Sequence, residues 1–130
     1  MQLGYTLIYV PDVIATAEFY ERAFGLKRKF VHPSQQYAEM DTGATVLAFA
    51  SNEMASGNEL HIRTNRKDQP AAGFEVCLVT TEPHSAFEQA VREGAESIRA
   101  PEVKPWGQTV AFLRDLNGCL VEICTPVNRP

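Results

Sequence analysis

The sequence predicts an α+β protein in which one unit, a strand, a helix and three further strands, occurs twice. Two observations support this. Apolar strand-like segments and one amphipathic helix follow in the same order in residues 1–50 and 73–130. Both predicted helices end at a glycine, and these glycines, Gly25 and Gly94, lie 69 residues apart. A repeated order of elements indicates a duplicated supersecondary unit. We therefore expect a single domain of two modules, 1–50 and 73–130, joined by a linker, 51–72.

The first module begins with residues 2–10, which are rich in β-formers and therefore predict a strand. Asp12 is a predicted N-cap for a helix over Val13–Phe24, whose apolar residues recur at helical spacing, and Gly25 is predicted to end it. Further strands are predicted at Lys27–Val31, 36–41 and 45–50.

The second module repeats this order, with a strand at 74–79 and a helix at 82–93. Pro83 lies in the first turn of this helix, where proline is tolerated, and Gly94 follows its end. Three strands are predicted after it, at 97–100, 108–114 and 119–124. The first strand and helix align with the first module at an offset of 69 residues, and the last strands align at 74.

Composition excludes several classes of protein. The chain has 130 residues, 45% of them hydrophobic, and a net charge of −4, so it has no electrostatic attraction for nucleic acid or an anionic membrane. No apolar run approaches the ~20 residues that span a bilayer, and the N-terminus lacks the build of a signal peptide. The three cysteines lie in strand-like apolar runs without a CxxC spacing: Cys77, Cys119 and Cys124. We expect them to be reduced and buried, and the protein to be cytoplasmic.

Two motifs carry a family resemblance. YVPDVIATAEFYERAFGL, in the first module, and WGQTVAFLRDLNGCLVEICTP, in the second, resemble the glyoxalase/bleomycin-resistance/dioxygenase superfamily, also called vicinal oxygen chelate proteins. The turn in the second motif contains Asn117-Gly118, itself a strong hairpin signal. The resemblance implies two βαβββ modules, each a curved mixed sheet, around a small-molecule cavity in a homodimer. It does not specify a reaction, because one fold hosts many chemistries.

The resemblance also implies four metal-ligand positions, one on each of four strands. In this sequence they correspond to Tyr5, Ala48, Phe74 and Glu122, and only Glu122 is a ligand type that binds divalent ions readily. We therefore expect no metal cofactor. A register slip of one residue would bring Glu75 inward in place of Phe74 and supply a second carboxylate, still without histidine. The three histidines are expected to be solvated, in a turn, the linker and a helix face: His32, His61 and His84.

Strand alternation predicts the lining of the cavity. The predicted inward residues are Tyr5, Leu7, Tyr9, Val46, Ala48, Ala50, Phe74, Val76, Leu78, Leu120, Glu122 and Cys124. Such a lining suits a flat organic ligand held by stacking, with Glu122 as its polar anchor. An inward carboxylate would have a raised pKa, which makes Glu122 a candidate general base. A solvated Glu122, or one paired with Arg114 or Lys104, is the alternative.

Trp106 precedes a predicted strand and has two interpretations. It caps the core at the rim, or it forms an aromatic platform at the mouth of the cavity. The Trp106-Gly107-Gln108 segment is similar to that of family members that sequester drugs. Tyr37 and Glu39 are further candidates, although exposed strand positions explain them equally well.

Three functions remain open at this point. The first is a metal-free protein that binds, and sequesters or processes, a small aromatic or amphipathic compound. The second is a glyoxalase-like lyase or isomerase, or an extradiol-type dioxygenase, that uses a divalent metal. The third is an accessory domain without a strong ligand. The identity of the ligand, and whether the cavity forms within one chain or across two, are not fixed by the sequence.

Overall fold

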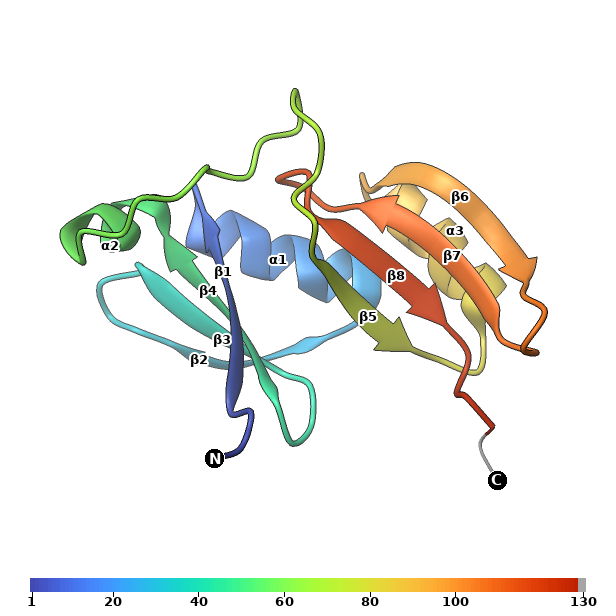
Figure 1. Cartoon of the computed structure of the whole chain (residues 1–130). Coiled ribbons are helices and arrows are strands. Elements are labelled where there is room, and N and C mark those ends of the chain that lie inside the picture. Colours follow the sequence, from blue (N-terminus) through green and yellow to red (C-terminus); the bar gives the residue numbers. More distant parts are fainter. Residues whose placement is uncertain (129–130) are drawn as a thin grey trace. The chain divides into compact units, whose positions relative to one another are not determined.

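A computed structural model describes residues 1–128, which form two compact units (Figure 1). Unit 1 comprises Met1–Asn65, and unit 2 begins at Arg66. The boundary between the units lies within the segment that the sequence assigns to a linker.

Unit 1 contains the first mixed sheet, sheet A. Its elements are β1 (Tyr5–Val10), α1 (Val13–Phe24), β2 (Lys27–Val31), β3 (Tyr37–Asp41), β4 (Val46–Ser51) and α2 (Asn52–Gly57). The strand order is β1-β4-β3-β2, in which β1 runs parallel to β4 and the other neighbours are antiparallel. The short helix α2 lies inside the predicted linker and packs on β1 and β4.

The caps of α1 explain why its bounds agree with the prediction. Asp12 accepts a hydrogen bond of 3.0 Å from the Ala15 N–H, which satisfies one of the free donors of the first turn. Gly25 has φ +68°, the left-handed conformation that ends many helices. Between these caps, Phe19 and Tyr20 are fully buried and anchor the helix to sheet A.

Unit 2 contains the second mixed sheet, sheet B, with the same topology. Its elements are β5 (Glu75–Val79), α3 (Pro83–Arg92), β6 (Glu96–Val103), β7 (Thr109–Arg114) and β8 (Leu120–Cys124). The order is β5-β8-β7-β6, with β5 parallel to β8 (Figure 1). The duplicated βαβββ unit is therefore confirmed. Strand β6 is longer than predicted, because irregular pairing with β7 accommodates Pro101 inside it.

Each sheet carries a helix on one face, and we call the opposite face its open face. Along β1, Ile8 and Val10 are buried on the helix side, whereas Tyr5 and Leu7 are 61% and 39% exposed on the open face. Along β8, the buried Val121 and Ile123 lie on the helix side. Because side chains alternate along a strand, Glu122 lies on the open face of sheet B.

The hairpin between β7 and β8 is fixed by its turn. The buried Asp115 carboxylate accepts hydrogen bonds from the backbone N–H groups of Asn117 and Cys119. Gly118 has φ +88°, which a residue with a side chain adopts only with strain. This is the hairpin that Asn117-Gly118 predicts.

The side chain of Arg114 ties the start of unit 2 to this hairpin. Its guanidinium donates to the carbonyl oxygens of Gln69 (2.7 Å), Arg66 (3.1 Å) and Gly118 (2.8 Å). A Cβ added at Gly118 would lie 2.6 Å from Arg114 Nη2 and 2.8 Å from the Arg66 oxygen. The turn therefore requires glycine for its backbone conformation and for this close approach.

We expect Gly118→Ala to lower the free energy of unfolding by about 1–3 kcal/mol, through backbone strain and steric clash. It should also speed trypsin cleavage after Arg66 and Lys67, because the Arg114 contacts with this segment loosen. Urea denaturation and timed proteolysis measure both effects. Gly73→Ala is the control, since its Cβ meets nothing within 4 Å. Equal stability of the two variants would contradict this role of the turn.

Candidate functional site on the open faces of the sheets

The open face of sheet A is apolar and aromatic along β1 and β4. In the parallel pairing, Tyr5 lies opposite Val46, Leu7 opposite Ala48, and Tyr9 opposite Ala50. All of β4 is buried, so its alanines form a floor beside the exposed Tyr5 and Leu7 side chains. The geometry places these predicted residues side by side, and their role as ligand contacts remains a prediction.

Two polar residues on β3 extend the same face. Tyr37 lies opposite Ala50, and Glu39 lies opposite Ala48. The Tyr37 hydroxyl donates to Glu39 Oε2 at 2.8 Å. Burial, and then the hydrogen bond and negative charge of Glu39, raise the pKa of Tyr37 to about 12. Both side chains are half-buried and bonded to each other, which exposed strand positions alone do not explain.

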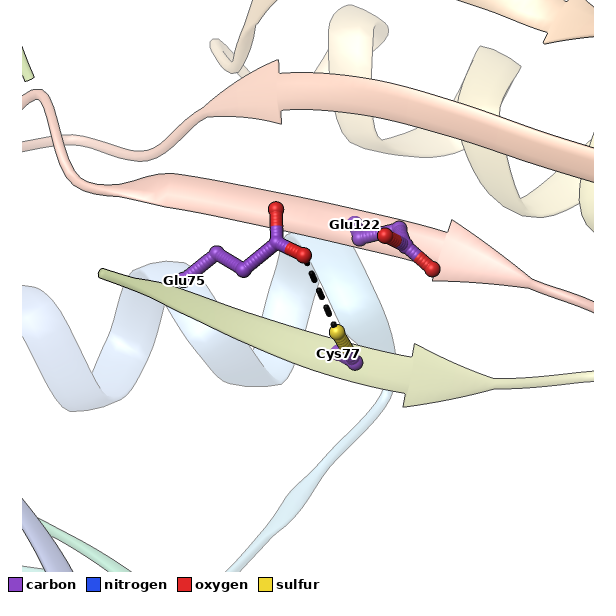
Figure 2. Close-up of side chains that lie close together, drawn as sticks. All are labelled: Glu75, Cys77 and Glu122. Carbon is purple, nitrogen blue, oxygen red and sulfur yellow. Dashed lines mark hydrogen bonds between the residues drawn. The ribbon is translucent and has the colours of Figure 1, made fainter. Parts of the chain in front are cut away.

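The open face of sheet B carries a cluster of Glu75, Cys77 and Glu122 (Figure 2). Cys77 lies opposite Glu122 in the β5–β8 pairing, and Glu75 precedes it on the same side of β5. One ligand atom from each residue lies within 4.8 Å of the others. The Cys77 thiol donates to Glu75 Oε1 at 3.4 Å. The cluster thus brings two carboxyl groups and a thiol together on two adjacent strands.

This cluster corrects the predicted inward residues of β5. Because Glu75 and Cys77 lie on the open face, alternation places Val76 and Leu78 on the helix side, and Phe74 lies outside the strand. Glu75 therefore takes the position that the prediction gave to Phe74.

The error arises from a one-residue difference between the two helices. The N-cap Glu82 follows Asp12 by 70 residues, whereas Gly94 follows Gly25 by 69. Aligning the modules on the glycines that end the helices therefore misplaces the strand before the helix by one residue. A slip of one residue moves every side chain of a strand to the other face.

Glu122 has an acidic partner and not a basic one. Burial raises the pKa of Glu122, and a hydrogen bond with Glu75 raises it further. The two cations considered as its partners are engaged elsewhere: Arg114 with backbone carbonyls and Lys104 with Glu102 at 3.6 Å.

The cysteines only partly match the expectation. Cys119 and Cys124 are buried and free, as predicted, but Cys77 is exposed. Burial, and then the charge of Glu122, raise the pKa of the Cys77 thiol to about 12, so it is protonated at neutral pH. The expectation of burial was wrong for Cys77 because it rested on the apolar neighbours Val76 and Leu78, which lie on the other face.

Trp106 lies in the turn between β6 and β7 and is 65% exposed, so the interpretation as a cap on the core is wrong. Its indole N–H donates to Gln108 Oε1 at 2.7 Å, and Gln108 Nε2 donates to the Thr125 carbonyl at 2.8 Å. The ring is therefore held in place at one end of sheet B. Its role as a platform for a ligand remains a prediction.

The donor set on sheet B fits one kind of metal ion. Zn²⁺ accepts both thiolate and carboxylate ligands, and three protein ligands leave a fourth position open. Thiolate is a poor ligand for Mg²⁺, Ca²⁺ or Mn²⁺, so these ions suit this cluster less well than Zn²⁺ does. No histidine takes part in the cluster, and the three histidines, His32, His61 and His84, are exposed as expected.

A separate hollow of about 460 Å³ lies at the start of α1 in unit 1. Its lining includes Asp12, Glu18, Ser34, Gln35 and Glu53. None of the predicted site residues lines it, so it does not belong to the open face. Among the described residues, no helix has the length and apolar character needed to cross a membrane.

The comparisons with known proteins agree with this architecture. A sequence model of the Glyoxalase/Bleomycin resistance protein/Dioxygenase superfamily matches residues 2–123. Two curved-sheet modules of this topology and a match over nearly the whole chain define the class: the chain belongs to this superfamily. No curated protein sequence matches it.

Solved structures share the fold at low sequence identity. A glyoxalase-related enzyme from Fulvimarina pelagi is similar with a TM-score of 0.81 and 21% identity, over 97% of this chain and 88% of that one. A family enzyme from Burkholderia phytofirmans PsJN has a TM-score of 0.82 and 21% identity, over 98% and 100%. TioX from Micromonospora sp. ML1 has a TM-score of 0.73 and 19% identity, over 96% and 98%. At these identities the likeness shows the fold alone.

The raised pKa of Glu122 predicts a pH-dependent effect of Glu122→Gln. Ionising this carboxyl is less favourable in the folded protein than in the unfolded chain. The loss of folding stability that Glu122 causes therefore grows as pH rises above 4.5, the ordinary pKa of a glutamate. We expect Glu122→Gln to raise Tm at pH 7 and to have little effect near pH 4. Thermal unfolding across this range measures the difference, with Glu88→Gln on α3 as the control. A Tm gain for Glu122→Gln that is independent of pH would contradict the assignment.

Proposed function

We propose that this protein binds a small aromatic or amphipathic organic molecule on the open face of sheet A, without a resident metal. One observation carries the proposal. Two of the positions where the superfamily's enzymes place metal ligands hold Tyr5 and Ala48, which form part of an aromatic and apolar surface on sheet A. An alanine has no donor atom, and a tyrosine binds a metal only as a phenolate, whose reference pKa is about 10.

The open face of sheet A is suited to a flat ligand. The exposed ring of Tyr5 and the side chain of Leu7 offer apolar area beside the buried Ala48 and Ala50. Aromatic rings contribute stacking energy of about 0.5–1.5 kcal/mol per pair beyond the area that they bury. Such a surface binds by shape and stacking and needs few polar groups.

Sheet B carries polar side chains of its own. The carboxyl groups of Glu75 and Glu122 lie close together, and burial raises the pKa of Glu122, so the pair accepts hydrogen bonds and donates one when Glu122 is protonated. With its raised pKa, Glu122 is also the candidate general base, if the protein processes its ligand. Trp106 offers a fixed ring at the end of the same sheet.

We expect removal of the Tyr5 ring to weaken ligand binding at least tenfold, because stacking area is lost. The measurement is a thermal-shift screen of planar aromatic compounds on EDTA-treated protein, followed by calorimetric affinities for Tyr5→Ala and Val91→Ala. Val91→Ala is the control, because it removes an exposed apolar side chain on the outer side of α3. A ligand near Trp106 should also quench its fluorescence. Equal affinities for both variants, or no binding by any compound in the presence of EDTA, would count against the proposal.

A second function is favoured by a specific observation, the cluster of Glu75, Cys77 and Glu122. These residues would hold Zn²⁺ in a metal-dependent lyase, isomerase or dioxygenase of this superfamily. A bound zinc ion polarises a substrate oxygen as a Lewis acid. The thiol would have to lose its proton on binding, against a pKa of about 12 in the metal-free cluster.

Our proposal predicts that the purified protein, after dialysis against micromolar zinc, retains less than about a tenth of an equivalent. Elemental analysis measures the content, and Glu122→Ala and Cys77→Ser are the variants to compare. One equivalent of zinc in the wild type that is lost in both variants would establish the metal-dependent alternative instead.

We also propose that the protein works as a homodimer in the cytoplasm. Exposed apolar side chains outside the proposed binding surface, including Val79 and Val103, favour covering by a partner copy, and two-fold dimers are the commonest solution. The acidic net charge of −4 gives no attraction for nucleic acid or anionic membranes.

A further inference from the structure

We infer that the ligand bound by the open face of sheet A is a planar aromatic cation, held between ring faces and the carboxylate of Glu39. This inference rests on the proposed function and adds the charge class of the ligand. Three observations support the inference: Glu39 lies among aromatic side chains, its carboxylate accepts a hydrogen bond from Tyr37, and the cations Lys27 and Arg28 are directed to other residues.

The strand pairing places residues of the open face in two neighbouring rows that run across sheet A. In one row, Leu7, Ala48, Glu39 and Phe30 lie opposite one another on successive strands. The next row contains Tyr9, Ala50 and Tyr37. Each row has an alanine in its middle and larger side chains on either side. The side chains of β1 on one side, and of β2 and β3 on the other, therefore flank and cover these alanines, which are at most 1% exposed.

The rings on the β2 and β3 side support one another. The ring centroids of Phe30 and Tyr37 lie 6.4 Å apart, and those of Phe30 and His32 are also 6.4 Å apart. Tyr9 lies across Ala50 from Tyr37. Aromatic side chains thus lie on both sides of the floor, as a stacked planar ligand requires.

Tyr37 orients the carboxylate of Glu39. The phenol keeps its proton at neutral pH, because the pKa of Tyr37 is raised to about 12, and it donates to Oε2 at 2.8 Å. This bond engages Oε2 and restricts the rotation of the carboxylate. A carboxylate held in this way is preorganised and loses little conformational freedom on binding.

The two cations at the start of β2, Lys27 and Arg28, are directed to residues other than Glu39. Arg28 pairs with Glu18 and Glu21 of α1, on the helix side of the sheet. Lys27 lies opposite Asp41, at the end of β2, and not opposite Glu39. A cation on the ligand would therefore gain both the carboxylate and the ring faces, which attract positive charge.

The test compares 9-aminoacridine, a cation at pH 8, with acridine, which has the same three rings and is neutral at that pH. Calorimetry on the wild-type protein should give at least tenfold tighter binding of 9-aminoacridine. Glu39→Gln should reduce this preference to less than threefold while acridine binding is kept. Tyr37→Phe retains the charge but loses the orienting bond, so it should give an intermediate preference.

Glu88→Gln on α3 is the matched control, because it removes the same charge from an exposed helix position and should leave the preference unchanged. Equal binding of both dyes, or a preference that survives Glu39→Gln, overturns the inference while the proposed function stands. If other neutral or anionic aromatic compounds bind and neither dye binds, the inference is also overturned and the proposed function stands. Failure of every aromatic compound to bind rejects the inference and the proposed function together.

Discussion

The pairing of β5 with β8 decides what chemistry sheet B offers. With Cys77 opposite Glu122, alternation puts two carboxyl groups and a thiol on the open face and leaves Val76 on the helix side. A shift of one residue would reverse this and replace the acids by apolar side chains. The buried face of β8, with Val121 and Ile123 under α3, specifies the register, because slipping would expose both of them.

The two units share a topology and differ in chemistry. The pair of Leu7 and Ala48 on sheet A corresponds in strand position to Cys77 and Glu122 on sheet B. Sheet A carries rings, buried alanines and one hydrogen-bonded carboxylate, whereas sheet B carries two neighbouring carboxyl groups and a thiol. The duplicated unit has therefore kept its backbone while its open faces have diverged, one toward stacking and the other toward hydrogen bonding.

Local signals in the sequence predicted most of the fold. Asp12 and Gly25 bound α1, and Asn117-Gly118 forms the hairpin, because caps and tight turns depend on residues close in sequence. Which side chains of β5 lie on the open face could not be predicted in the same way. The alignment of β5 with β1 depends on how many residues α3 has between its caps, and the sequence repeat did not show this number. The bond from Tyr37 to Glu39 had a readable signal, because residues two apart in a strand share a face.

Backbone amide NMR during titration of the EDTA-treated protein with a planar aromatic compound tests the central claim most directly. The largest chemical-shift changes are expected on β1, β3 and β4 around Ala48. Changes confined to α1 and α3, or changes that appear only after zinc is added, would contradict an open-face site that works without a metal.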